Sequence, residues 1–283
     1  MIKKIIFTGI LVFAHPLYAE TLETAPLFVF DTHLHYNAGH AHQYREEDIR
    51  QIFDQNNISH AIITSNPPEL ALKLYKTAPD IITPFLGIYD EQHDKQDWFQ
   101  DAELPNRINK ALANRSWKGI GEIHLFAEQR HNPVFQQIVQ LANAHSLPLL
   151  MHSDPAIIDQ IYDYAPEATV IWAHAGAYPY PPLLRDYLNR YSNLYIDLSM
   201  RNERIAPVGI LAPEWELLFM EYPGRFMLGV DTFSTSRWQH YGEHVGETRH
   251  WLAQLPQDIA HRISQQNASN LFGPSASGIA KKE

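Results

Sequence analysis

The order of apolar and amphipathic segments is the feature that most restricts the fold of this chain. Eight short apolar runs recur, at residues 27–30, 60–64, 81–88, 119–123, 147–151, 169–173, 194–198 and 226–230. Amphipathic segments lie between them; Ile49, Ile52 and Phe53, for example, have the spacing of one helical face. Strands that are apolar throughout and alternate with helices predict a parallel sheet covered on both sides.

Eight strand–helix units in a chain of 283 residues favour a closed (β/α)8 barrel, an α/β fold of the TIM type. The alternative is a doubly wound open sheet, which usually has fewer strands. Its dinucleotide-binding version needs a third glycine that Gly119-Ile120-Gly121 lacks. We expect helices to start after Asn66 and Asp154, because each precedes a proline, which is favoured at the first helical position.

Both ends of the chain differ from this pattern. Lys3 and Lys4 precede an apolar stretch, and Ala19 offers a small residue at a cleavage position, so residues 1–19 are typical of a secretory signal peptide. The stretch has about half of the roughly 20 apolar residues that a spanning helix needs. We therefore expect a periplasmic or secreted protein. Residues 20–273 would form the catalytic barrel and residues 274–283, which open with the helix breaker Pro274, a disordered tail.

Composition restricts the partners. The formal charge of −10 becomes −12 when Lys3 and Lys4 are removed, and an acidic surface argues against binding nucleic acid through phosphate neutralisation. No later segment resembles a membrane span, so we expect no membrane contact in the mature form. The chain has no cysteine, so its stability must come from the core and not from disulfides. A small-molecule substrate is the expected partner, and a homo-oligomer remains open.

Ionisable residues stand where the predicted strands finish. The first strand ends in Asp31-Thr32-His33-Leu34-His35, and the later strand ends carry Glu122, His124, His152, His174 and Asp231. The C-terminal strand ends of a barrel meet at one mouth, so these residues are expected to be neighbours. His33 and His35 should point the same way, because side chains alternate along a strand. Histidines together with acids suit Zn²⁺ or a similar divalent ion.

Each of these residues also has an ordinary structural explanation. A second His-x-His pair, His40 and His42, lies in a polar loop and is interpreted as solvated or at a pocket rim, so the motif alone proves little. Glu122 could pair with a surface lysine, although burying it unpaired would be costly. The remaining candidates have similar alternatives: His152 and His174 could be satisfied core histidines, Asp231 a helix cap, and His124 a pocket-lining residue.

Taken together, the residues Asp31 to His35, Glu122, His152, His174 and Asp231 resemble the amidohydrolase superfamily, and most closely its amidohydrolase-related branch of lactonases, hydratases and decarboxylases. The resemblance covers nearly the whole mature chain. It implies that His33, His35 and Asp231 hold a first metal ion, and that Glu122 stands where other members have a carboxylated lysine or a bridging glutamate.

The same resemblance leaves the metal count at one or two. His152 and His174 would hold a second ion; many members of the closest branch instead bind one ion and leave the histidine matching His174 for catalysis. Glu122 is also similar to the strand-four glutamate of TatD-type nucleases, although the acidic charge and the export signal argue against a nuclease.

These observations predict a hydrolase of a small ester, lactone or amide. A divalent ion lowers the pKa of a bound water to about 7, and Asp231 would accept its proton and pass it to the leaving group. His174, where it is not a ligand, would stabilise oxyanion charge. Arg201 is a candidate clamp for a substrate carboxylate. His124 and the aromatic loop residues are candidates for a substrate-binding wall: Tyr36, Tyr178, Tyr180, Phe233 and Trp238.

Three other functions stay open at this point. The same metal site would also serve the decarboxylation or hydration of a small carboxylic acid. A metal-free glycosidase would use Glu122 and Asp231 as paired carboxylates, but it leaves the strand-end histidines without a role. A non-catalytic periplasmic binding or metal-storage protein would bind a ligand without turnover.

Overall fold

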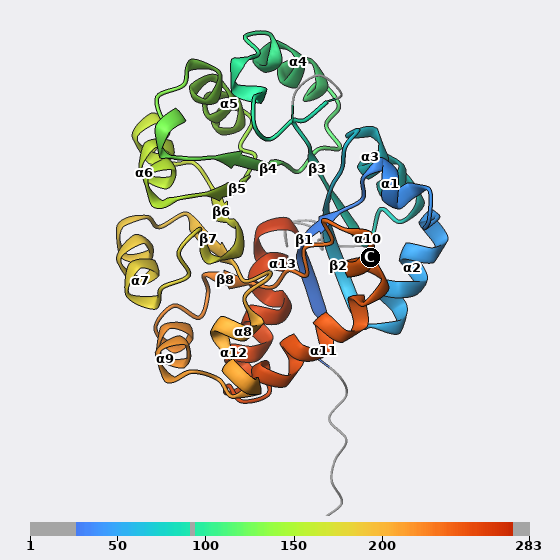
Figure 1. Ribbon diagram of the computed structural model, residues 1–283, viewed down its shortest axis with the longest axis vertical. Helices are drawn as coiled ribbons and strands as arrows, with labels where there is room; N and C mark the ends of the chain where they lie inside the picture. The colour runs from blue at the N-terminus through green and yellow to red at the C-terminus, as the bar shows by residue number, and fades with distance from the viewer. Residues whose placement is uncertain (1–26, 91–93, 274–283) are drawn as a thin grey trace, which may run out of the picture.

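Eight parallel strands follow one another around a ring in the computed structural model, which describes residues 27–90 and 94–273 (Figure 1). They are β1 (Val29–His35), β2 (Ile58–Thr64), β3 (Ile82–Leu86), β4 (Gly119–Leu125), β5 (Leu149–Ser153), β6 (Val170–Trp172), β7 (Leu194–Asp197) and β8 (Phe226–Met227). Each strand pairs with the next in sequence. A parallel bridge between Asp31 and Leu228 brings the last strand beside the first. The predicted (β/α)8 barrel is confirmed.

Helices surround the strands (Figure 1). In chain order they are α1 (Ala38–Ala41), α2 (Glu46–Gln55), α3 (Glu69–Thr77), α4 (Leu104–Ala111), α5 (Pro133–Ala144), α6 (Pro155–Tyr164), α7 (Pro181–Arg190), α8 (Asn202–Ile205), α9 (Pro213–Glu221), α10 (Thr235–Gln239), α11 (Tyr241–Leu252), α12 (Gln257–His261) and α13 (Asn267–Phe272). None of the helices in the described part of the chain has the length and apolar character needed to cross a membrane. The predicted signal peptide and C-terminal tail lie outside the described residues.

The two predicted helix starts have different outcomes. Helix α6 begins at Pro155 with Asp154 as its N-cap residue, as predicted. Helix α3 begins at Glu69 and not directly after Asn66, so that prediction was wrong by two residues. The hydroxyl of Ser65 accepts the backbone N–H of Ala71 at 2.9 Å and donates to the carbonyl of Pro67, so a serine turn occupies the segment before the helix.

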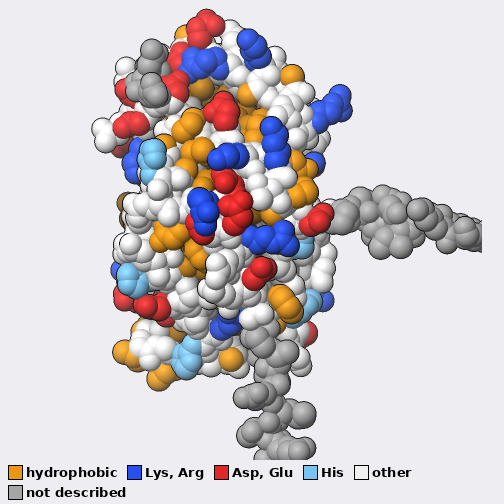
Figure 2. All heavy atoms as spheres, turned by 90° about the vertical axis from the view of Figure 1, so that its right-hand side faces the viewer, with side chains coloured by type: hydrophobic (Ala, Val, Ile, Leu, Met, Phe, Trp, Pro, Cys, Tyr) orange, Lys and Arg blue, Asp and Glu red, His pale blue; other side chains and the backbone are white. Residues whose placement is uncertain are grey.

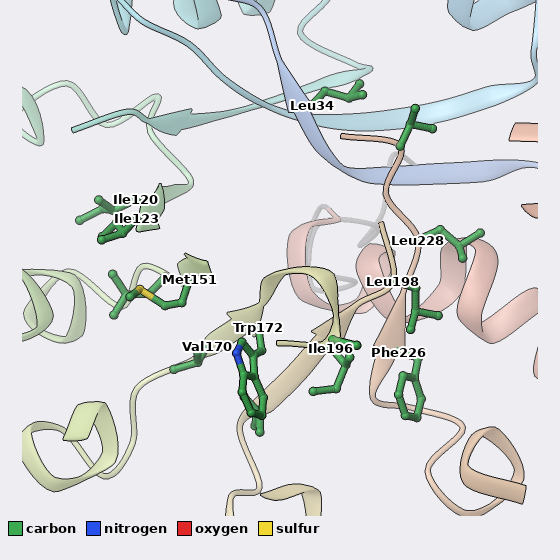
Figure 3. Packing of buried hydrophobic residues seen from close by; sticks show 14 of the residues in the cluster. Leu34, Ile120, Ile123, Met151, Val170, Trp172, Ile196, Leu198, Phe226 and Leu228 are labelled. Atoms are coloured by element: carbon green, nitrogen blue, oxygen red, sulfur yellow. The ribbon is translucent and has the colours of Figure 1, made fainter. Parts of the chain in front are cut away.

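Side chains that alternate along the strands form two apolar layers. The outward layer packs against the helices, and Figure 3 shows part of it, including Met151, Trp172, Ile196 and Phe226. The inward layer fills the barrel floor with Phe30, Ile62, Phe85, Leu150, Ile171 and Met227. Phe272 of α13 closes this floor; its ring lies 6.1 Å from that of Phe30 and 5.7 Å from that of Phe85. The opposite, C-terminal end of the barrel is therefore left for polar chemistry.

One face of the molecule is mixed in charge. Acidic and basic side chains are interspersed on the face seen in Figure 2, without a broad patch of one sign. Such a face lacks the continuous positive stripe by which proteins bind a nucleic-acid backbone.

Candidate metal centre

The glutamate of β4 is the centre of a cluster of histidines at the mouth of the barrel. One oxygen of Glu122, Oε1, lies 3.0 Å from Nδ1 of His152 and 3.1 Å from Nε2 of His174. The other, Oε2, lies 3.3 Å from Nε2 of His35. The strand-end residues predicted to meet are therefore brought together, although they come from five different parts of the barrel.

The two histidines of β1 face the same cluster. Nε2 of His33 lies 3.6 Å from Glu122 and 3.8 Å from Asp231, and Nε2 of His35 lies 3.3 Å from Oδ1 of Asp231. Leu34, between them, is buried in the outward layer shown in Figure 3. The predicted common orientation of the two imidazoles is thus confirmed, even though a register shift interrupts the pairing of β1 with β2 between Asp31 and Leu34.

Three polar atoms in this cluster are buried without a hydrogen-bond partner: Nε2 of His33, Nε2 of His35 and Oδ1 of Asp231. Buried polar atoms are nearly always paired, so three orphans that face one point call for a ligand. A tetrahedral ion with ligands at about 2.1 Å keeps its donor atoms about 3.4 Å apart, which is close to the separations found here. The residues therefore fit a divalent ion such as Zn²⁺ or Mn²⁺.

Electrostatics supports the same conclusion. Burial lowers the pKa of His33, yet the neighbouring carboxylates, Glu122 first, raise that pKa well above its ordinary value. The pKa of His35 is also raised, because Asp231 and Glu122 outweigh burial. Burial would raise the pKa of Asp231, but the histidines, His33 first, hold it at about 2. Because its acids stay ionised, the site favours positive charge, which either protonated histidines or a bound metal ion would supply.

Asp197, at the end of β7, was not predicted from the sequence as a residue of the site. It is fully buried, and its Oδ2 lies 2.9 Å from Nδ1 of His33 and accepts the backbone N–H of His174 at 3.2 Å. It also accepts the hydroxyl of Ser199. By distance, Asp197 could share a metal ion with His33 and His174. Because these hydrogen bonds already occupy its carboxylate, its role is to orient the two histidines. An aspartate inside the apolar run 194–198 was the available signal, since an unpaired buried charge is costly.

Hydrogen bonds behind the cluster set which nitrogen each histidine presents. Nδ1 of His33 donates to Asp197, which leaves Nε2 free to act as a ligand. The hydroxyl of Ser199 donates to Asp197, so it accepts from Nδ1 of His174 at 2.8 Å. Nε2 of His174 is thereby directed at Oε1 of Glu122, 3.1 Å away. In both rings Nδ1 donates to a protein acceptor, as in histidines that bind metal through Nε2.

Two arginines hold the backbone at the site. His174 and Asp231 both have positive φ angles, 59° and 60°, which non-glycine residues rarely adopt. The Nε–H of Arg201 donates to the carbonyl of His174 at 2.6 Å, and the Nε–H of Arg237 donates to the carbonyl of Asp231 at 2.6 Å. The strained backbone that aims each side chain at the cluster is thus held by a guanidinium group.

A pocket of about 480 Å³ opens above the cluster. Arg201 and His124, both candidate substrate-binding residues, line it together with Phe233. Burial lowers the pKa of His124 to about 3, so its ring is neutral at ordinary pH. Lys95 and Tyr89, which the sequence analysis did not single out, line the pocket as well.

Tyr36 does not join the pocket wall, contrary to expectation. It is buried in the core, and its hydroxyl donates to the carbonyl of Tyr44 at 2.6 Å. Trp238 is likewise buried, and its indole N–H donates to the carbonyl of His35. The solvated or pocket-rim position expected for His40 was wrong too: its side chain is buried, it does not line the pocket, and Nδ1 accepts the backbone N–H of Asn37. Aromatic residues that follow barrel strands can face either the pocket or the helices, and sequence alone does not distinguish these directions.

The comparison with known families agrees with this site. A family model described as Amidohydrolase matches residues 89–273, more than half of the chain. The chain belongs to the amidohydrolase family. The match includes Glu122, His152, His174 and Asp231 but begins after the two histidines of β1. No curated protein sequence matches this amidohydrolase.

Solved structures share the fold of this amidohydrolase. A probable 2-pyrone-4,6-dicarboxylic acid hydrolase from Acinetobacter baumannii has a TM-score of 0.58 at 15% identity, covering 88% of this chain and 100% of that one. A 5-carboxyvanillate decarboxylase from Novosphingobium aromaticivorans, with bound manganese, has a TM-score of 0.58 at 14% identity, covering 88% and 97%. A TatD homologue from Escherichia coli has a TM-score of 0.62 at 14% identity, covering 87% and 98%. Identities this low establish the shared barrel and leave the reaction to be argued from the site.

Proposed function

We propose that this amidohydrolase is a metal-dependent hydrolase of a small ester, lactone or amide. The observation that carries the proposal is the convergence of the unpartnered atoms of His33, His35 and Asp231 beside Glu122, at the base of a pocket large enough for a small molecule. Such a site has no evident role in holding the fold together, because the core lies in the two apolar layers.

The residues of the cluster would hold two ions, and Asp231 would also handle a proton. His33, His35 and Asp231 would hold one ion, and His174 and His152 a second, with Glu122 between them. When bound, a divalent ion supplies a water acidic enough to react near neutral pH and polarises a substrate carbonyl. Zn²⁺ is the ion we propose first, since imidazole and carboxylate ligands suit it; manganese in the structural relative makes Mn²⁺ the alternative.

Asp231 is the proposed proton carrier. Its carboxylate is ionised, with a pKa of about 2, and its Oδ1 faces the cluster without a hydrogen-bond partner. It would take the proton from the attacking water and pass it to the leaving group. Arg237 holds its backbone carbonyl, so the carboxylate has a fixed position over the cluster.

Removal and return of metal test this proposal. Protein stripped with a chelator should lose hydrolysis of a panel of esters, lactones and amides, and Zn²⁺ or Mn²⁺ should restore it. Asp231→Asn should retain the fold and lose nearly all activity. Full activity in protein shown to be free of metal would refute the proposal.

A second candidate is decarboxylation or hydration of a small carboxylic acid. Arg201 and Lys95 line the same pocket and would bind the carboxylate of an acidic substrate. A neutral ester has no charge that would require these two cations. Arg201 already donates to the carbonyls of His174 and Gly176, and its guanidinium has further N–H groups. Release of CO₂ from a panel of aromatic and aliphatic acids, at rates above those of ester hydrolysis, would favour this reaction.

We also propose that the protein is exported, on the basis of its first nineteen residues. Mass spectrometry of the protein from its native host should find a mature chain that begins at Glu20. A chain that still begins at Met1 and stays in the cytoplasm would contradict export.

A further inference from the structure

The hydroxyl of Tyr89 makes two contacts with one residue, His124. It accepts the backbone N–H of His124 at 2.8 Å, and it lies 2.8 Å from Nδ1 of the His124 ring. Both residues line the pocket above the metal cluster. Tyr89 follows β3 and His124 belongs to β4, so the contacts join two neighbouring strand ends.

Counting protons fixes the tautomer of the ring. A phenol has one proton to donate, and its oxygen already accepts the backbone N–H. Among the described residues, Nδ1 of His124 is the acceptor within reach of that proton. A ring protonated on Nδ1 would leave the phenol proton without an acceptor in a partly buried site, which is costly. Nδ1 is therefore the acceptor, and the proton of the neutral ring is on Nε2.

The protonated nitrogen faces the chemistry. Nε2 of His124 lies 3.5 Å from Oε2 of Glu122, and the ring stacks on His152 with 4.4 Å between centroids. By distance alone, Glu122, His124 and His152 are close enough to hold an ion. A nitrogen that carries a proton has no lone pair to offer, so this trio does not form a metal site.

We propose that Tyr89 is a positioning residue, which fixes His124 as a hydrogen-bond donor to a carbonyl or carboxylate oxygen of the substrate and keeps it from binding metal. The inference rests on the proposed function for the role of the substrate, but the tautomer itself is a property of the protein alone. It separates His124 from His33 and His174, whose Nδ1 atoms donate and whose Nε2 atoms face the carboxylate of Glu122.

Histidine tautomers can be measured directly by ¹⁵N NMR. The experiment uses the full chain labelled with ¹⁵N-histidine and loaded with Zn²⁺, which is diamagnetic, and two-bond ¹H–¹⁵N correlation spectra. His124→Gln assigns the signals by their loss. We expect a pyridine-type Nδ1 and a pyrrole-type Nε2 for His124. Tyr89→Phe, which removes one oxygen, should abolish this pattern, and Tyr75→Phe, on the outer helix α3, should leave it unchanged.

Metal content provides a second readout. His124→Gln should bind the same number of Zn²⁺ equivalents as the unaltered protein. A pyridine-type Nε2 in the unaltered protein, or loss of one Zn²⁺ equivalent in His124→Gln, would overturn the inference. Unaltered protein that binds no ion at all would contradict the proposed function, whereas the tautomer spectra, which need no ion, would still decide this inference.

Discussion

Asp197→Asn is the substitution that tests the architecture of the site most informatively, because Asp197 supports two proposed metal ligands, His33 and His174, without being one of them. It is fully buried, lies 2.9 Å from Nδ1 of His33, and accepts the backbone N–H of His174. Asparagine has nearly the same shape but no charge. Its NH₂ group would face a donor in either orientation, because Oδ2 accepts from Nδ1 of His33 and the hydroxyl of Ser199, and Oδ1 accepts from the backbone N–H of Ser199.

The expected magnitude follows from this support. Removing the outer partner of a metal-binding histidine typically weakens metal affinity 10–100-fold, which is about 1.4–2.8 kcal/mol of binding free energy. We expect Asp197→Asn to fall in this range, since the carboxylate both orients His33 and raises its basicity.

Competition against a fluorescent chelator at fixed pH measures the affinity for Zn²⁺ and for Mn²⁺. Asp186→Asn, which removes an exposed carboxylate on α7, is the matched control and should leave the affinity unchanged. A folded Asp197→Asn protein with unaltered affinity would refute the reasoning, because His33 would then not depend on its buried partner.

Three further predictions concern pH, backbone support and the core. Protons compete with metal for His33 and His35, whose pKa values are raised, so metal affinity should fall as pH drops from about 8 to about 5; a pH-independent dissociation constant would contradict this. Arg237→Lys keeps the charge but loses the guanidinium that donates to the carbonyls of both Asp231 and Val230, and should cost about 1.5–3 kcal/mol of stability in urea unfolding; an unchanged midpoint would show that these carbonyls need no guanidinium. Phe85→Ala should cost about 3–5 kcal/mol in the same assay, since the barrel floor would be left with a cavity. A loss of less than about 1 kcal/mol, roughly the contribution of one buried methylene group, would mean that Phe272 refills the space.

The strand–helix alternation and the strand-end residues were sufficient to predict the fold and most of the cluster. Each apolar run became a barrel strand, because a parallel strand covered on both sides must be apolar throughout. His33, Glu122 and Asp231 could be expected to meet, since barrel geometry brings strand ends together whatever their distance in sequence.

What the sequence did not reveal depends on side-chain direction and on hydrogen bonds between distant segments. Tyr36 was expected in the pocket and is in the core. Asp197 was passed over inside an apolar run, and its partner His33 is 164 positions away. The tautomer of His124 depends on a phenol 35 positions away. Such contacts follow from the packed structure and have no local pattern in the sequence.

The measurement that tests the central claim most directly is metal quantification by mass spectrometry on the purified protein, compared with His33→Ala. We predict one or two equivalents of a divalent transition metal in the unaltered protein and the loss of at least one equivalent in the variant. An unaltered protein that binds no divalent ion after incubation with Zn²⁺ and Mn²⁺, or a folded His33→Ala protein that binds as many as the unaltered one, would contradict it.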